Sequence, residues 1–296
     1  MKYLSLSIVL AFLFLVACNT AKDIHTSGSD NSVLNAYERH LIDSILQCGL
    51  DNEALFTLLG DIKPMSSLVT FTFPVANTDS AKRVDGNVLN RSTHGMYLDR
   101  MQTIQEAVNK LNIPDLQFIM VPYISSRGNK RTIQLSVVRK SSLDKLLKEK
   151  ESFYGQFGLV PGTDPPVVVV TAIEGNGKFE RWRGYGYLFG YPDYAVDFFN
   201  QAAIDSEKQG ETAKRNAFRI PTYNPKYSNF VYTYPIDHVP TADVDSVLYH
   251  RSVKILEEYK NIRNNYLNAD SSVQSYRLLR DYYKSKIKNK QQLLND

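Results

Sequence analysis

Apolar side chains recur every three or four residues in several stretches of this 296-residue chain, which is the spacing of one face of an α-helix. The stretches with this spacing are residues 33–47, 52–60, 96–111, 141–150, 176–209 and 242–294. The residues at 190–192, Gly-Tyr-Pro, interrupt the fifth stretch, and Asp270 and Ser271 mark a turn within the sixth. We therefore expect two helices in each of the last two stretches.

Four other stretches alternate between apolar and polar positions or are rich in β-branched and aromatic residues, as strands are. They are residues 67–74, 116–124, 132–138 and 230–234. The polar segment 125–131 contains a Gly-Asn pair and predicts a hairpin between the second and third of these strands. Residues 167–170 are four consecutive valines after two prolines, a pattern typical of a strand buried on both faces. We expect this valine strand at the centre of the sheet.

The elements together predict an α+β fold, with a mostly antiparallel sheet covered by helices. The two helices of residues 242–294 are expected to form a C-terminal antiparallel helix pair that packs on the sheet. Residues 33–296 contain no internal repeat and are predicted to form a single α+β domain, with a soft boundary near residue 240.

Composition narrows the class of protein. Hydrophobic residues make up 43% of the chain and charged residues 22%, which is typical of a globular protein and excludes a disordered chain. The 35 basic and 31 acidic residues leave a net charge of only +4, so we expect no nucleic-acid partner. Two cysteines are too few for a disulfide framework or a cysteine-based metal site, and the five histidines are scattered. We expect no metal and no cofactor.

The N-terminus has the layout of a secretion signal. A single Lys2 precedes an apolar run over residues 4–17, which is shorter than the roughly 20 apolar residues that span a bilayer. The end of the run, LVAC at residues 15–18, resembles the lipobox of bacterial lipoprotein precursors. That resemblance implies that residues 1–17 are a signal peptide cleaved before Cys18. It also implies that the Cys18 thiol carries diacylglycerol and that the new N-terminus is acylated, as with palmitate.

The resemblance places the domain outside the cytoplasm, in a bacterial cell envelope, anchored to a membrane through Cys18. Two or three acyl chains would hold it firmly, because each buried CH₂ contributes about 0.8 kcal/mol. The sequence does not choose between an inner and an outer membrane. Residues 18–32 begin with Cys18 and are otherwise mostly small and polar, so they are expected to form a flexible tether. Cys48, the other cysteine, ends an apolar helix pattern and is expected to be a buried structural thiol.

One segment, residues 181–193, holds the single tryptophan together with three tyrosines and three glycines. Its candidate ligand-binding residues are Arg181, Arg183, Tyr185, Tyr187, Tyr191 and Asp193. A glycine within a helix costs about 1 kcal/mol relative to alanine, so these glycines need a reason. Two reasons remain open: close packing of the helix on a sheet, or the floor of a ligand pocket.

No complete catalytic motif is present, and the catalytic candidates are five separate residues. They are Lys63, Ser66, His94, Asp237 and His238. Lys63 and Ser66 lie in an expected helix-to-strand loop and could form a Ser–Lys pair. If the fold brought Asp237 and His238 to Ser66, the three would resemble an orienting carboxylate, a base and a nucleophile. Further along the chain, Asp243 and Asp245 follow Thr241, and this short segment is expected to cap the start of a helix.

These observations favour an envelope lipoprotein whose domain binds a small-molecule ligand or an envelope protein. Tyrosine and arginine are favoured at recognition surfaces, and the chain contains 19 tyrosines. Two alternatives remain open. One is a tethered hydrolase that acts on an envelope substrate, and the other is a structural or assembly lipoprotein that docks through the C-terminal helix pair.

Overall fold

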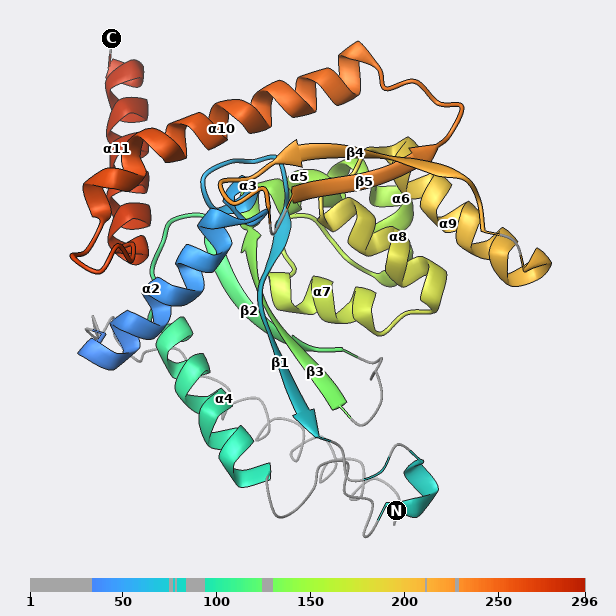
Figure 1. Cartoon of the computed structure of the whole chain (residues 1–296), viewed down its shortest axis with the longest axis horizontal. Helices are drawn as coiled ribbons and strands as arrows, with labels where there is room; N and C mark the ends of the chain where they lie inside the picture. The colour runs from blue at the N-terminus through green and yellow to red at the C-terminus, as the bar shows by residue number, and fades with distance from the viewer. Residues whose placement is uncertain are drawn as a thin grey trace, which may run out of the picture. The chain divides into compact units, whose positions relative to one another are not determined.

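A computed structural model describes residues 34–74, 77, 79–83, 94–123, 130–210, 212–226 and 229–295. The chain from Leu34 onward forms one compact unit (Figure 1). The expected signal peptide, Cys18 and the tether lie outside the described residues, as do most of the hairpin segment 125–131 and part of the loop between residues 75 and 93. Within the described part of the chain, no helix is both long enough and apolar enough to cross a membrane.

The central sheet has three strands: β1 (Met65–Pro74), β2 (Leu116–Pro122) and β3 (Lys130–Arg139). They run in the order β1-β3-β2, and β3 is antiparallel to both neighbours. In this register, Phe71 lies opposite Ile133 and Ile119 opposite Ser136. The three strands, their antiparallel arrangement and the pairing of β2 with β3 confirm what the alternating sequence predicted.

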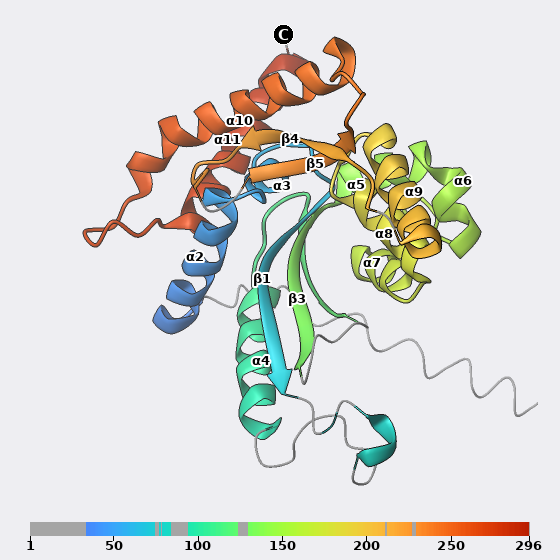
Figure 2. The ribbon, with the colours of Figure 1, turned by 45° about the vertical axis from the view of Figure 1, so that its right-hand side comes forward.

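Helices cover both faces of this sheet, as Figure 2 shows. On one face, α2 (Ala36–Asp51) and α4 (His94–Asn109) pack on Phe71, Leu135 and Val137. On the other face, α5 (Lys140–Glu149), α7 (Pro166–Glu174) and α8 (Lys178–Leu188) pack on Ile119 and Val138. The sheet therefore separates two hydrophobic clusters, and each cluster carries one of the hollows described below.

The valine run is the main error of the sequence prediction, because it belongs to helix α7 and not to a central strand. Val169 and Val170 are buried, while Val167 and Val168 are 38% and 45% exposed. Ile173 continues the buried face one turn later. A short apolar run fits either a buried strand or a helix, and here Pro166 occupies the first helical turn, where its missing N–H is not needed.

The segment that the sequence singled out forms a helical hairpin. Helix α8 ends at Leu188, Gly190 adopts a left-handed conformation with φ of 73°, and α9 (Asp193–Gln209) follows. The predicted break between two helices is confirmed. A second, two-stranded antiparallel sheet comes next, with β4 (Arg215–Pro221) and β5 (Asn229–Pro235). The sequence analysis missed β4, whose alternate positions are exposed and in part charged.

The C-terminal helices α10 (Val247–Arg263) and α11 (Ser275–Asn295) confirm the predicted pair. They contact each other in an antiparallel sense, because Tyr282 bonds back to Glu258 while Asp281 meets Tyr266. Their apolar positions are mostly covered, as Leu256 and Leu279 are buried. Helix α11 also packs along α2.

Short elements complete the described chain. They are α3 (Leu55–Leu58), α6 (Glu151–Tyr154), the 3₁₀ turns Ser80–Lys82, Gly155–Phe157 and Asn264–Tyr266, and the π-helical turn Ala242–Ser246 before α10. Cys48 corrects a further expectation, since its side chain on α2 is exposed and not buried. The apolar stripe of α2 turns toward the core through Ile45, Leu46 and Leu50, which leaves position 48 at its edge.

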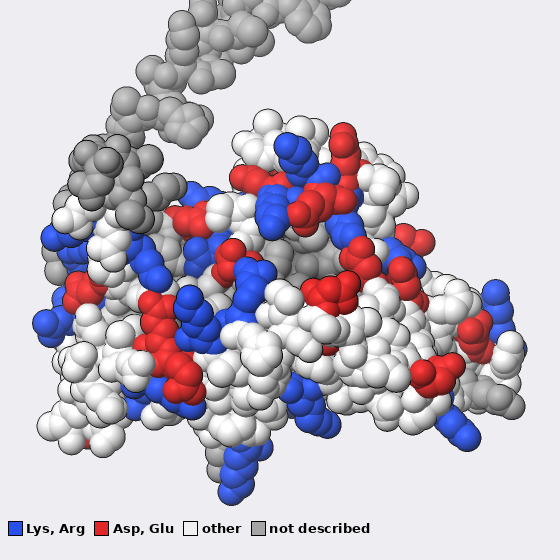
Figure 3. All heavy atoms as spheres, turned by 90° about the horizontal axis from the view of Figure 1, so that it is seen from above, with Lys and Arg blue, Asp and Glu red and all other residues white. Residues whose placement is uncertain are grey.

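Charged groups of both signs are interspersed on the face that contains α10. In the view of Figure 3, basic and acidic side chains alternate over this surface and do not gather into a patch of one sign. Many of them pair locally, as Lys260 does with Glu257 and Lys286 with Glu258.

Replacing Gly190 with alanine is expected to lower the free energy of unfolding by about 3 kcal/mol. An added Cβ would lie 2.6 Å from the carbonyl oxygen of Ile62, on a residue whose φ already favours glycine. Gly210 is the matched control: its φ is 74°, but a Cβ there would contact nothing within 4 Å. Gly210→Ala should therefore cost only about 1 kcal/mol. Urea unfolding of both variants measures the difference, and equal losses would contradict the close approach at Gly190.

Candidate functional site

The α8–α9 hairpin and strand β5 enclose a cavity of about 300 Å³, which we call the aromatic pocket. Its lining residues come from α8, the α8–α9 turn, α9 and β5. They are Trp182, Tyr185, Gly186, Phe189, Tyr191, Ala195, Val196, Phe199, Asn200, Val231, Tyr232 and Thr233. None of these twelve lining residues is of a charged type.

The glycines of α8 explain how the pocket forms. A Cβ on Gly186 would lie 2.8 Å from the side chain of Val196, so the missing side chain lets α9 approach α8 closely. Gly184 has the same role against Ile173 of α7, where a Cβ would lie 2.7 Å away. The two interpretations left open by the sequence are therefore compatible, because Gly186 both packs a helix and lines the pocket.

Aromatic rings form most of the wall. Tyr185 and Phe189 stack with their ring centroids 5.6 Å apart, and Trp182 lies 5.5 Å from Phe199 across the hairpin. Tyr191 stacks on Phe230, which lies behind it in the core, at 5.6 Å. Such ring pairs hold their geometry without a ligand. The wall is thus preformed, as small-molecule pockets usually are.

Asn200 contributes a buried amide to the wall. Its side chain is only 1% exposed, and its amide nitrogen donates to the Val196 carbonyl oxygen at 3.0 Å. Because a carbonyl can only accept, the nitrogen of the amide must face Val196. The other atom, Oδ1, is buried and has no hydrogen-bond partner within the described residues. A buried acceptor left unpaired costs about 1–3 kcal/mol.

The phenols around the pocket remain protonated at neutral pH. Tyr185 donates to Glu174 at 2.9 Å, and burial together with nearby acidic groups raises the pKa of Tyr185. Burial likewise raises the pKa of Tyr191 and Tyr232.

Behind β5, a buried carboxylate holds the pocket wall in place. Asp245 accepts hydrogen bonds from the hydroxyls of Tyr194 and Tyr232 at 2.6 and 2.5 Å, and from the Thr241 backbone N–H at 2.6 Å. Burial opposes ionisation of Asp245, but these bonds outweigh it and lower the pKa of the carboxyl. The capping expectation changes accordingly: Asp245 bonds back to Thr241, and the Thr241 side chain does not cap the turn.

Only part of the predicted ligand set lines the pocket. Tyr185 and Tyr191 do. Arg183 instead pairs with Asp197 on the surface. Tyr187 is buried on the opposite side of α8, beside Tyr154, and Asp193 pairs with Lys150. Arg181 is half-buried and does not line the pocket.

Sequence reasoning missed Trp182, Phe199, Asn200 and Tyr232 as lining residues. A signal for three of them was present. Positions 182, 185, 186 and 189 share one face of α8, and positions 195, 196, 199 and 200 share one face of α9. Two such faces joined by a short turn meet each other. Tyr232 has no comparable signal, because its neighbours are set by the tertiary fold.

The catalytic candidates are held by other partners. The fully buried Lys63 pairs with Glu53 at 2.7 Å, and Ser66 shares a hydrogen bond with Thr57 at 2.8 Å. His238 stacks on Tyr194 at 4.3 Å, and its Nε2 is buried without a partner within the described residues. Asp237 is exposed, and the side chain of His94 lies outside what the structure describes. The described hydrogen bonds do not join Ser66 to Lys63 or to His238.

Neither a metal-ligand cluster nor a similar protein gives further information on this site. Among the described residues, no group of three or more histidine, cysteine, aspartate or glutamate side chains could hold a metal ion. No protein-family model matches the chain, and neither a curated protein nor a solved structure matches it.

Replacing Asp245 with asparagine is expected to lower the free energy of unfolding by about 2 kcal/mol at neutral pH. The pKa of Asp245 is lower in the folded state than in the unfolded chain, where it is about 3.9. The ionised carboxylate therefore stabilises the fold fully at pH values above about 3.9. That stabilisation disappears as pH falls through the folded-state pKa, so the gap between wild type and variant should close in acid. Chemical denaturation across a pH series measures the gap. Asp243→Asn, at an exposed position two residues earlier, is the matched control. Equal losses of stability in the two variants would contradict the stabilising role of the Asp245 carboxylate.

Proposed function

We propose that this chain is a lipid-anchored protein of the bacterial envelope whose domain binds a small, neutral, largely aromatic ligand in the aromatic pocket. One observation carries the ligand class: the pocket has a preformed aromatic wall, no charged lining residue, and one buried acceptor, Asn200 Oδ1, without a partner in the described chain. The anchor rests on the lipobox resemblance that ends at Cys18.

The size and chemistry of the pocket support binding of a small molecule. A volume of about 300 Å³ is at the lower end of ligand pockets, so the guest has the size of one or two rings. The desolvated wall disfavours a charged guest, because burying an unpaired charge costs several kcal/mol. The acceptor on Asn200 selects a guest that carries an O–H or N–H group.

The catalytic candidates give no comparable support to a hydrolase. Lys63 is surrounded by Glu53, Phe189 and Phe230, and it does not line the aromatic pocket. Binding is therefore the function that the described geometry supports best.

The full chain is expected to bind 4-butylphenol more tightly than its methyl ether, 4-butylanisole, by about tenfold. The two probes have the same ring and tail, but only the phenol can donate to Asn200, and one neutral hydrogen bond contributes about 1 kcal/mol net. Trp182 is the single tryptophan of the chain and lines the pocket, so its emission reports binding directly.

Two variants make this test specific. Asn200→Leu keeps the shape of the side chain and removes the acceptor, so both probes should then bind alike. Val231→Phe places a larger side chain in the pocket lining and should weaken the binding of both probes. If Trp182 emission responds to neither probe in the wild-type protein, the proposed ligand class is wrong.

Expression in a bacterium that processes lipoproteins tests the anchor. The wild-type chain is expected to incorporate labelled palmitate and to lose residues 1–17, because the acylated residue would be Cys18. Cys18→Ser should abolish the label, whereas the matched variant Cys48→Ser should keep it. Intact mass and radiolabel measure both effects. Label that survives in Cys18→Ser would show that the acylation site lies elsewhere.

A further inference from the structure

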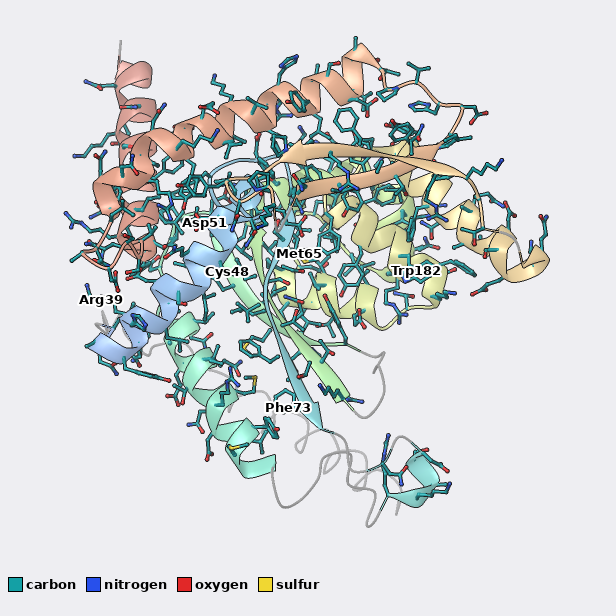
Figure 4. All side chains as sticks on the ribbon, in the orientation of Figure 1. Arg39, Cys48, Asp51, Met65, Phe73 and Trp182 are labelled. Atoms are coloured by element: carbon teal, nitrogen blue, oxygen red, sulfur yellow. The ribbon has the colours of Figure 1, made fainter. Side chains whose placement is uncertain are left out.

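A second hollow lies on the opposite side of the central sheet, between α2, β1 and α4. It has a volume of about 410 Å³ and is lined by Tyr37, Leu41, Ser44, Ile45, Cys48, Val69, Phe71, Arg100, Thr103 and Ile104. A smaller hollow of about 130 Å³ adjoins it and shares Phe71 and Arg100 with it. We call the two together the α2–α4 groove. Figure 4 labels Cys48 on α2 and Trp182 on α8, with the strands of the sheet between them.

The groove is elongated along strand β1. Its floor extends from Val69 to Phe73, which is about 13 Å at the rise of a β-strand. Its walls are mainly apolar, and Tyr37 at its rim is 67% exposed. Strand β1 is an edge strand, and no described strand pairs with its outer edge. The shape suits a chain better than a compact ring.

Arg100 is the charged residue among those that line the α2–α4 groove. The Arg100 guanidinium sits 5.8 Å from the centre of the Phe71 ring, and it forms no ion pair with any described residue. The other lining residues carry no charge, and their polar groups include the hydroxyls of Ser44, Thr103, Thr70 and Thr72. Guanidinium binds carboxylate and phosphate through paired, charge-assisted hydrogen bonds. Arg100 is exposed at this wall, where its guanidinium could form such bonds with an anion in the groove.

From this charge and shape we infer that the α2–α4 groove binds a single-chain amphiphile that carries one anionic headgroup, a carboxylate or a phosphate. The apolar walls along β1 hold the chain, and Arg100 pairs with the headgroup. This site is separate from the aromatic pocket, which has no cation and selects neutral guests.

Cys48 supplies a native reporter for the groove. Its thiol is exposed and lines the hollow, and its Sγ lies 3.9 Å from the Leu68 carbonyl oxygen of β1. A bound alkyl chain would cover it. In the full chain carrying Cys18→Ser, Cys48 is the single thiol, so the rate of its alkylation by iodoacetamide measures occupancy of the groove.

Four probes with the same ten-carbon alkyl tail separate the contributions of chain and charge: undecanoate, decyl phosphate, 1-decanol and decyltrimethylammonium, each below its micelle or solubility limit. The anionic probes are expected to slow alkylation about tenfold at ten times their dissociation constant. Decanol should protect at higher concentration, and the cationic probe should not protect. The carboxylate and phosphate arms show which headgroup is preferred.

Arg100→Leu should raise the half-protecting concentration of the anionic probes about three- to tenfold and leave that of decanol unchanged. The matched control is Arg280→Leu on α11, since Arg280 is also exposed and lies 5.6 Å from the Tyr276 ring. That variant should behave as wild type. The inference is overturned if the anionic probes protect no better than decanol, or if their advantage survives in Arg100→Leu.

Discussion

The buried Lys63 ammonium group lies between the α3–β1 segment, the α8–α9 turn and β5. The arrangement of the residues around the aromatic pocket depends on the partners of this charge. The Lys63 side chain is fully buried, 2.7 Å from a Glu53 carboxylate oxygen, with its Nζ 4.7 and 5.3 Å from the ring centres of Phe230 and Phe189. Burial lowers the pKa of Lys63, and the Glu53 carboxylate opposes that shift. Removing one partner of a buried pair destabilises a protein by about 3–5 kcal/mol, far more than an exposed pair contributes. The short segment between α3 and β1 is therefore fixed more firmly than its length suggests.

That segment also positions the helical hairpin. The backbone of Ile62 and Lys63 packs directly against Gly190, which is the reason why the α8–α9 turn tolerates no Cβ. On the other side, the carbonyl oxygens of Thr57 and Leu58 accept hydrogen bonds from the buried guanidinium of Arg139, which also bonds the Tyr283 hydroxyl of α11. Two buried cations thus connect the sheet, the hairpin and the C-terminal helix. The pocket residues Phe189 and Tyr191 pack against this centre, Phe189 over Lys63 and Tyr191 on Phe230.

Local periodicity predicted most of the fold, and it failed where tertiary burial decides the outcome. The alternating strands β1, β2 and β3 and the long amphipathic helices follow from one-sided burial, which leaves a period in the sequence. The four valines of α7 leave none, because β-branched residues at consecutive positions fit a strand as well as a helix. Strand β4 was missed for the opposite reason: Arg215 and Arg219 lie on its exposed side, and its pairing with β5 supplies the stability that its composition does not. The burial of Cys48 was predicted wrongly, because consecutive residues of a helix point in directions 100° apart around its axis. A residue next to the apolar stripe can therefore be exposed.

The sites were less predictable than the fold, since a site depends on which polar groups remain unpaired. The sequence marked the aromatic and glycine-rich segment, and its glycines and two of its tyrosines do shape a pocket. It could not distinguish Arg183, which Asp197 neutralises, from Arg100, which no described residue neutralises. Nor could it show that Asn200 uses its nitrogen within the helix and leaves its oxygen free. The two hollows differ in their polar groups as well as in size: a buried acceptor lies beside neutral rings in one, and an exposed cation lies along an apolar strand in the other. Because the sheet separates the two hollows, the two ligands that we propose would not compete for one site.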